Sequence, residues 1–193
     1  MNFIREYNHV SQDLCDEIID FFHQENVLKT PGAITRNGEK TLDPEFKNST
    51  DFWIPAGTTP APWLTEYVDQ LTECTKEYVK EFPYSVEYGR WTICEGMRIQ
   101  WYKPGESFCG WHTERIDASF PNATRHLVFM TYLNDVEDGG ETEFFHQNLK
   151  TKAVKGKTVI WPADWTYTHR GVVSPTQHKY IITGWYNYQY QGN

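Results

Sequence analysis

Hydrophobic residues near the N-terminus recur at the spacing of an amphipathic helix. The repeat consists of Leu14, Cys15, Ile18, Ile19 and Phe22, which share one face when the chain winds at about 3.6 residues per turn. Ser11 precedes the repeat as a suitable N-cap, and Asp13 places a negative charge in the first turn, where the helix dipole favours it. The pattern predicts a helix from Ser11 to about Glu25, preceded by a short strand at Phe3-Ile4.

A second helical repeat begins near Pro62. Its apolar face consists of Leu64, Tyr67, Val68, Leu71, Cys74 and Tyr78. Pro83 lacks the N–H group that would continue the hydrogen-bond ladder, so the helix is predicted to end before it.

Residues 29–62 separate the two predicted helices and show no sustained period. The stretch is rich in Pro and Gly and has a near balance of charge. A long irregular stretch inside a compact domain usually has a function of its own or is loosely ordered. Two interpretations remain open. Part of 29–58 is a lid over a site near Trp111 and Trp165, or the stretch is an extended arm along a sheet edge.

From residue 86 onward the pattern changes to alternation, and turn residues separate strand-length segments. The predicted strands are Arg90–Cys94, Met97–Tyr102, His126–Leu133, Glu141–Phe145, Thr158–Trp161 and Lys179–Tyr186. Helices followed by strands predict an α+β fold in which the helices pack against one side of a double sheet. No repeat or linker divides the chain, so residues 1–193 are expected to form a single domain.

Composition and charge exclude several classes of protein. The net charge of −8 argues against a protein that tracks the phosphates of nucleic acid. No run of 18 apolar residues and no signal peptide occur, so we expect no membrane partner and a cytoplasmic location. The four cysteines lack C-x-x-C spacing, which disfavours a zinc knuckle.

Candidate chemistry centres on His112 and Glu114, which point to the same side if the chain between them is extended. One further histidine would complete two imidazoles and one carboxylate, the facial triad of non-haem iron(II) oxygenases. His169 is the first candidate. His126 and His178 compete with it, although alternation turns His178 away from whatever its neighbour Lys179 faces, while His126 could face inward.

Three blocks follow one another over about residues 90–187. They are Arg98-Ile-Gln-Trp-Tyr-Lys-Pro-Gly with His112-Thr-Glu114, the run from Arg125 to Phe144 that contains Tyr-Leu-Asn-Asp and Gly-Gly-Glu-Thr-Glu-Phe, and His169-Arg-Gly with Lys179-Tyr-Ile-Ile-Thr-Gly-Trp185. Together they resemble the double-stranded β-helix (jelly-roll) oxygenases that use iron(II) and 2-oxoglutarate, most closely their prolyl 4-hydroxylase-like branch. The resemblance implies a jelly-roll catalytic core at 90–187, with residues 1–89 as helical support and a lid-like stretch.

The resemblance also implies roles for individual residues. His112, Glu114 and His169 correspond to the metal ligands, although most members have Asp where this chain has the longer Glu114. Lys179 corresponds to the residue that pairs with the C5 carboxylate of 2-oxoglutarate. The co-substrate pocket would also contain Tyr102, Tyr132, Thr183 and Trp185, and the candidates for substrate contact are Arg98, Gln100, Trp111, Arg115 and Trp165. Alternation alone predicts that Met130 and Tyr132 share one face and that Lys179, Ile181, Thr183 and Trp185 share another, both turned toward the barrel interior.

The activity that the resemblance implies is hydroxylation of an unactivated C–H bond with release of succinate and CO2. It implies Fe(II), 2-oxoglutarate and O2, and leaves ascorbate open as a further cofactor. The expected substrate is a peptidyl proline, and a free amino acid or other small molecule is the alternative; oligomeric state stays open. A non-catalytic cupin-like binder would have no reason to hold Lys179. A zinc hydrolase with two His and one Glu would need a general base that these blocks do not supply.

Overall fold

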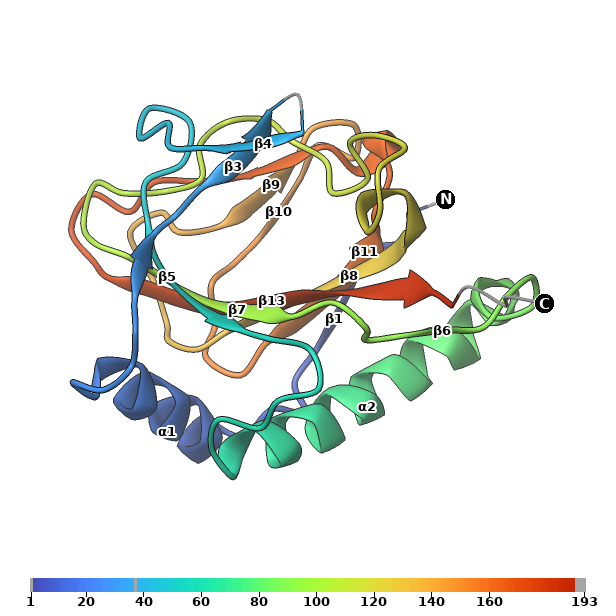
Figure 1. The fold of residues 1–193 in the computed structure, drawn as a ribbon, viewed down its shortest axis with the longest axis horizontal. Helices are drawn as coiled ribbons and strands as arrows, with labels where there is room; N and C mark the ends of the chain where they lie inside the picture. Colours follow the sequence, from blue (N-terminus) through green and yellow to red (C-terminus); the bar gives the residue numbers. More distant parts are fainter. Residues whose placement is uncertain (1, 37, 190–193) are drawn as a thin grey trace.

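The structure is a computed structural model that describes residues 2–36 and 38–189. A large antiparallel sheet faces a smaller sheet, and two helices lie under the outer face of the large one (Figure 1). The strands of the large sheet run in the order β1 (Arg5–Tyr7), β11 (Thr158–Pro162), β8 (Arg125–Tyr132), β13 (Lys179–Tyr188), β7 (Met97–Tyr102), β5 (Thr50–Ile54) and β2 (Thr30–Pro31), with β6 (Trp91–Thr92) also paired to β13.

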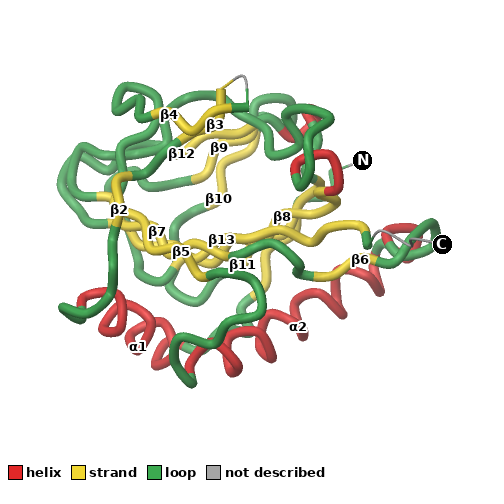
Figure 2. Tube along the Cα trace, viewed as in Figure 1, coloured by secondary structure: helices red, strands yellow, loops and turns green. Residues whose placement is uncertain are grey.

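The smaller sheet covers the opposite side of the interior, as Figure 2 shows. It consists of β10 (Leu149–Thr151), β9 (Thr142–Phe144) and β12 (His169–Gly171). A separate hairpin joins β3 (Ile34–Arg36) to β4 (Glu39–Thr41), and three 3-10 turns occur among the described residues at Pro83–Ser85, Asn122–Thr124 and Trp165–Tyr167. The two facing sheets confirm the expected α+β fold with a double-stranded β-helix core.

The helices agree with the sequence pattern. Helix α1 spans Gln12–His23, and the Ser11 side chain accepts a hydrogen bond from the Leu14 amide at 3.3 Å, which confirms the predicted cap. Helix α2 spans Trp63–Glu81 and ends before Pro83, which begins a 3-10 turn. Neither described helix combines the length and hydropathy needed to cross a bilayer.

The two faces of the large sheet bury different clusters. On β8, Leu127 and Phe129 pack toward the helices, while Val128 and Met130 belong to the cluster between the sheets. β13 lies between β7 and β8 and pairs Thr183 with both Arg98 and Met130. The predicted alternation is therefore confirmed, and one side of each central strand faces the interior.

Two predicted strands differ from the structure. The first strand begins at Arg5 rather than at Phe3-Ile4, because its register on β11 pairs Arg5 with Ile160 and Tyr7 with Thr158. Ile4 is buried without being part of a ladder. The strand predicted at Arg90–Cys94 contracts to the two residues of β6, which reach only the end of β13.

The irregular stretch 29–62 contributes strands that its sequence did not predict. β5 pairs with β7 along five residues, and β2 pairs with β5 at the sheet edge. The extended-arm interpretation is therefore confirmed for 50–54. Another part of the stretch, between Thr30 and Lys47, contributes residues to the wall of a cavity described below. Its movement as a lid stays a prediction that limited proteolysis can test.

Candidate active site

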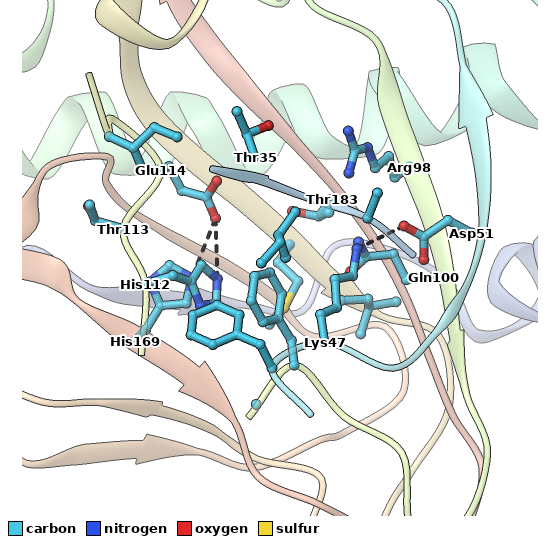
Figure 3. A pocket seen from close by; sticks show the side chains of 18 of the residues that line it. Thr35, Lys47, Asp51, Arg98, Gln100, His112, Thr113, Glu114, His169 and Thr183 are labelled. Atoms are coloured by element: carbon cyan, nitrogen blue, oxygen red, sulfur yellow. Dashed lines mark hydrogen bonds and ion pairs between the residues drawn. The ribbon is translucent and has the colours of Figure 1, made fainter. Parts of the chain in front are cut away.

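A cavity of about 650 Å³ lies between the two sheets. Its floor consists of interior-facing residues of β5, β7, β8 and β13, and its other walls come from β9, β12 and the segments 30–47 and 108–116. Figure 3 shows the polar side chains that converge on it. Such a volume is typical of a small-molecule or peptide site.

Three side chains with metal-ligating atoms meet at one end of the cavity. His112, Glu114 and His169 place one ligand atom each within 4.8 Å of one another, the one such group found among the described residues. Glu114 Oε1 lies 3.8 Å from His112 Nε2 and 3.5 Å from His169 Nε2. The structure thus brings the three predicted ligands together, and we call them the His-Glu-His triad.

Backbone pairing fixes the two histidines relative to each other. The His112 amide donates to the His169 carbonyl at 3.0 Å, and the His169 amide donates to the His112 carbonyl at 2.9 Å. This bridge joins the 108–116 segment to β12. The extended chain after His112 then brings Glu114 to the same side, as the two-residue spacing predicted.

The imidazoles are oriented as ligands. His112 Nδ1 lies 2.8 Å from the Gly110 carbonyl, and His169 Nδ1 lies 3.0 Å from the Tyr167 carbonyl. A carbonyl only accepts, so each Nδ1 carries the proton and each Nε2 keeps a lone pair turned toward Glu114. Burial, reinforced by His169, lowers the pKa of His112 to about 3, which keeps its ring neutral at neutral pH.

The carboxylate of the triad is ionised and anchored. Burial would raise the pKa of Glu114, but its two histidine neighbours and the charge of Arg125 bring it below its usual range. Its second oxygen, Oε2, accepts a hydrogen bond of 2.9 Å from Trp185 Nε1. One carboxylate and two imidazole lone pairs converge with no proton between them, so the donor set suits a divalent cation such as Fe(II).

Arg125 supports this end of the cavity, a role that its position in the sequence did not predict. Its guanidinium donates to the Glu114 carbonyl at 2.9 Å and to both carboxylate oxygens of Glu95 at 2.8 and 2.7 Å. It also lies 3.9 Å from the ring centroid of Trp185. Arg125 reaches inward because the register between β8 and β13 shifts at Tyr186/Asn187.

The same shift corrects the expectation for His126. Arg125 and Leu127 pair with the consecutive residues Asn187 and Tyr186, which leaves His126 unpaired in the ladder. His126 does not face the interior beside Met130; its Nε2 lies 2.9 Å from the Ser85 carbonyl, outside the barrel. The predicted outward direction of His178 is confirmed, since its Nδ1 accepts from Trp101 Nε1 at 3.1 Å.

Lys179 lies at another part of the cavity wall and is buried. Its Nζ is 5.5 Å from the ring centroids of both Tyr102 and Tyr132, and it has no hydrogen bond or ion pair with any residue that the structure describes. Burial lowers the pKa of Lys179 to about 8, opposed by the charge of Glu141. A Cβ on Gly171, two residues after His169, would be 3.7 Å from Nζ, so the absence of a side chain there keeps the space beside the ammonium open.

The other predicted pocket residues differ in their positions. Tyr102, Thr183 and Trp185 line the cavity, and the Tyr102 hydroxyl donates to Gln100 at 2.9 Å. Tyr132 is fully buried behind the lining, and its hydroxyl is engaged by Thr142 and Thr151 at 2.8 and 2.9 Å. Only its ring is directed toward Lys179.

Among the predicted substrate residues, Arg98, Gln100 and Trp111 line the cavity. Arg115 does not, because it lies 3.3 Å from Asp164 in an ion pair at the surface. Trp165 is 66% exposed on its 3-10 turn and also lies outside the lining. Arg115 and Trp165 therefore lie outside the cavity although they are close in sequence to Glu114 and His169.

Residues 45–49 were missed by the sequence analysis and lie against the segment that carries His112. The Gly110 amide donates to the Phe46 carbonyl at 3.0 Å, and the Phe46 ring packs edge-on against Phe108. The Phe108 ring stacks on His112 with a centroid distance of 3.6 Å. No period marks this stretch, so no sequence signal could have placed it there.

Lys47 and Asp51 form a second unexpected group in the cavity wall. Lys47 Nζ lies 2.8 Å from Asp51 Oδ2, and the Ser49 hydroxyl donates to Asp51 Oδ1 at 2.7 Å. Burial lowers the pKa of Lys47, while Asp51 opposes that shift. Lysine and aspartate are rarely buried unless paired, so only the fold reveals this position.

Comparisons with known proteins agree with this geometry. Residues 97–187 match the family described as "2OG-Fe(II) oxygenase superfamily". No curated protein sequence matches the chain significantly. Among solved structures, the viral collagen prolyl hydroxylase of Paramecium bursaria Chlorella virus-1, in its 2OG complex, superposes with a TM-score of 0.72 at 20% identity and covers 97% of both chains.

Two further structures are similar over nearly the whole chain. A Pseudomonas putida prolyl-4-hydroxylase gives a TM-score of 0.71 at 14% identity, covering 98% of this chain and 95% of its own. A Trichoplax adhaerens prolyl hydroxylase, in complex with a hypoxia inducible factor oxygen degradation domain peptide fragment, gives 0.73 at 16% identity, covering 97% and 84%. At these identities the likeness establishes the fold.

Proposed function

We propose that this member of the 2OG-Fe(II) oxygenase superfamily, matched over residues 97–187, hydroxylates a prolyl residue of a peptide. The superfamily uses Fe(II), 2-oxoglutarate and O2, so the chain is a 2-oxoglutarate-dependent iron dioxygenase. The observation that carries the assignment of its site is the presence, in one cavity, of the His-Glu-His triad and a buried lysine without a partner among the described residues.

The triad would hold the iron. Its two imidazoles present Nε2 lone pairs and Glu114 presents one carboxylate oxygen, which leaves the remaining coordination positions for ligands from solution. With iron bound, O2 would be the oxidant: one of its atoms would enter succinate as 2-oxoglutarate loses CO2, and the other would enter the substrate as hydroxyl. The protein would position the substrate and co-substrates and enclose them in a cavity.

Lys179 would bind the far carboxylate of 2-oxoglutarate. A buried ammonium without a counter-ion is costly, and an anionic ligand removes that cost. Gly171 leaves room beside Nζ, and Tyr102 covers the ammonium from the neighbouring strand. Because Gly171 and His169 belong to the same short strand, one small diacid can reach from the lysine toward the triad.

Trp185 and Arg125 would keep the carboxylate of Glu114 in place. The indole donates to Oε2, and the guanidinium donates to the Glu114 backbone carbonyl. The first contact restricts the Glu114 side chain and the second its backbone, so that Oε1 remains the oxygen facing the histidines. We propose positioning roles for them, in addition to whatever contact Trp185 makes with bound molecules.

Peptidyl proline is the substrate that the similar structures favour. Three of them are described as prolyl hydroxylases, and one contains a peptide of hypoxia inducible factor. Residues of the segment 30–47 form part of the cavity wall, so an extended chain bound in the cavity would find contacts beyond the triad. A free amino acid of similar shape is the alternative.

The test is anaerobic reconstitution with Fe(II) and 2-oxoglutarate, followed by admission of oxygen in the presence of proline peptides or free amino acids. Succinate release coupled to a peptide product heavier by one oxygen, located on proline by fragmentation, supports the proposal. If succinate release is coupled only to hydroxylation of a free amino acid, the substrate is a small molecule and not a peptide. His112→Ala provides the background in every arm.

A further inference from the structure

The cavity is positively charged although the whole chain carries a net charge of −8. Among the described residues that line it, the basic side chains are Arg36, Lys40, Lys47, Arg98, Arg125 and Lys179, and the acidic ones are Asp51 and Glu114. A cleft of one sign within a low-dielectric wall concentrates ligands of the opposite sign. The cavity therefore favours a further anionic ligand, in addition to any that binds at the proposed metal site.

Most of these basic groups already have a partner. The ion pairs are Arg36 with Asp43 at 2.8 Å, Lys47 with Asp51 at 2.8 Å and Arg125 with Glu95 at 2.7 Å. Lys179 is reserved for the co-substrate under the proposed function. Within the described part of the chain, the side chains of Arg98 and Lys40 are left without a hydrogen bond or ion pair.

Arg98 is the better placed of the two. It lies on β7, where it pairs with Trp53 of β5 and Thr183 of β13. Its guanidinium carbon is 5.1 Å from the Trp53 ring centroid, which restricts the side chain. Figure 3 shows it across the cavity from the His-Glu-His triad. A guanidinium fixed over an aromatic ring presents a planar fork of donors that matches a carboxylate.

Arg98 and Lys179 lie at different positions along the cavity wall. Lys179 pairs with Tyr102 on β7, four residues after Arg98. That separation corresponds to about 13 Å along an extended strand. A small diacid held by Lys179 at one end and directed at the triad with the other has both of its ends engaged, which leaves Arg98 available for the substrate.

The cavity offers no matching site for a positive group. Asp51 accepts from Lys47 and Ser49, and Glu114 accepts from Trp185 and faces the histidines. These are the acidic residues of the lining within the described ranges. The α-ammonium of a free amino acid would therefore enter without a counter-ion, whereas an acidic side chain in a peptide brings only its negative charge.

We infer that this enzyme selects peptides that carry Asp or Glu near the hydroxylated residue, and that Arg98 binds this carboxylate. The inference rests on the proposed function in naming a peptide as the substrate of this cavity. Lys40, exposed on the hairpin, adds positive charge at the mouth without fixed geometry.

The test compares peptides that differ only in Glu or Gln at one position, from three residues before to three residues after a central proline. Binding is measured by fluorescence polarisation to anaerobic protein loaded with Fe(II) and 2-oxoglutarate. In at least one position Glu should bind at least about tenfold more tightly than Gln, as a charge-assisted hydrogen bond allows. Arg98→Gln should remove that ratio while leaving the Gln peptide unaffected, and Arg98→Lys should restore part of it.

Arg90→Gln is the matched control, because Arg90 is exposed and lies outside the cavity, so the same loss of charge should leave the ratio unchanged. Equal binding of Glu and Gln peptides at every position, or an unchanged ratio in Arg98→Gln, overturns the inference. Displacement of the peptide by free glutamate more readily than by the N-acetylated amide of glutamate overturns the choice of a peptide.

Two further measurements test the proposed function separately. One uses a parallel peptide series with alanine in place of the central proline, and the other measures the peptide mass after oxygen is admitted. A preference for Glu that depends on Arg98, combined with no oxygen on proline, would retain the acidic-peptide inference and remove the proline assignment. Hydroxylated proline with no preference for Glu would do the reverse.

Discussion

Trp185 Nε1 donates a hydrogen bond of 2.9 Å to Glu114 Oε2, and Glu114 Oε1 is thereby the oxygen that faces both histidines. One carboxylate thus contacts the indole on one side and the triad centre on the other. An Asp here would hold its carboxylate about 1.5 Å nearer to its own backbone, the length of one C–C bond, and one of the two contacts would lengthen. The longer side chain is therefore consistent with a metal-binding role.

Trp185→Phe should weaken Fe(II) binding by about ten- to a hundredfold, the usual effect of removing a partner of a metal ligand. The phenyl ring still packs near Arg125, so the loss reports the N–H donor. Anaerobic metal titration measures it, with Trp111→Phe as the control, because Trp111 lines the cavity but is engaged by Arg170. An unchanged iron affinity would contradict the anchoring role.

Replacement of individual histidines should distinguish the metal ligands from the histidines that do not bind metal. His112→Ala and His169→Ala should abolish iron-dependent turnover, because each removes one of three donors. His126→Ala and His178→Ala should keep most of it, since these rings bond to Ser85 and Trp101 outside the cavity. Near-normal activity in His169→Ala would refute the ligand assignment.

Lys179→Ala should raise the concentration of 2-oxoglutarate required by roughly ten- to a hundredfold, since a hydrogen bond to a charged group contributes about 1.5–3 kcal/mol. Iron affinity should change little, because Lys179 is not part of the triad. Isothermal titration with 2-oxoglutarate under anaerobic conditions measures the effect. Lys103→Ala, on the exposed turn after β7, is the control for charge alone, and equal effects of both variants would remove the assignment.

Binding of 2-oxoglutarate should weaken as pH rises through about 8. Burial lowers the pKa of Lys179 to about 8 in the free protein, so below that pH the ammonium is charged and binds the carboxylate. Above it the neutral amine predominates, and the dissociation constant should rise by about tenfold per pH unit. In Lys179→Arg the guanidinium stays charged, so its binding should be flat over the same range. A flat profile in the unmodified protein would contradict this cause.

Breaking the buried pair of Lys47 and Asp51 should destabilise the fold. Lys47→Ala leaves Asp51 charged and without its ammonium partner, a change that costs about 3–5 kcal/mol of unfolding free energy in buried pairs. Lys76→Ala in the exposed pair with Glu73 should cost less than about 1 kcal/mol. Urea unfolding measures both, and recovery of stability in Lys47→Met with Asp51→Leu would identify the unpaired charge as the cause.

Apart from the choice of His169, which came from the family resemblance, the sequence by itself determined the helices, most central strands and the common direction of His112 and Glu114. These features are carried by local patterns: the cap at Ser11, the stop before Pro83, and alternation that turns Lys179, Thr183 and Trp185 to one side. The spacing of His112 and Glu114 sets their common direction wherever the chain is extended. Local periodicity is therefore sufficient for these predictions.

Only the tertiary structure decided which residues share the cavity. The shift between β8 and β13 turns Arg125 inward and His126 outward, and a single extra residue in a strand leaves no mark in the pattern of polar and apolar positions. Lys47, Asp51 and Phe46 come from a stretch without any period. They reach the cavity through long-range pairing of that stretch with β7 and through backbone hydrogen bonds to Ser107 and Gly110. Such contacts depend on where distant segments meet, and that is set by the packing of the two sheets rather than by neighbours in the chain.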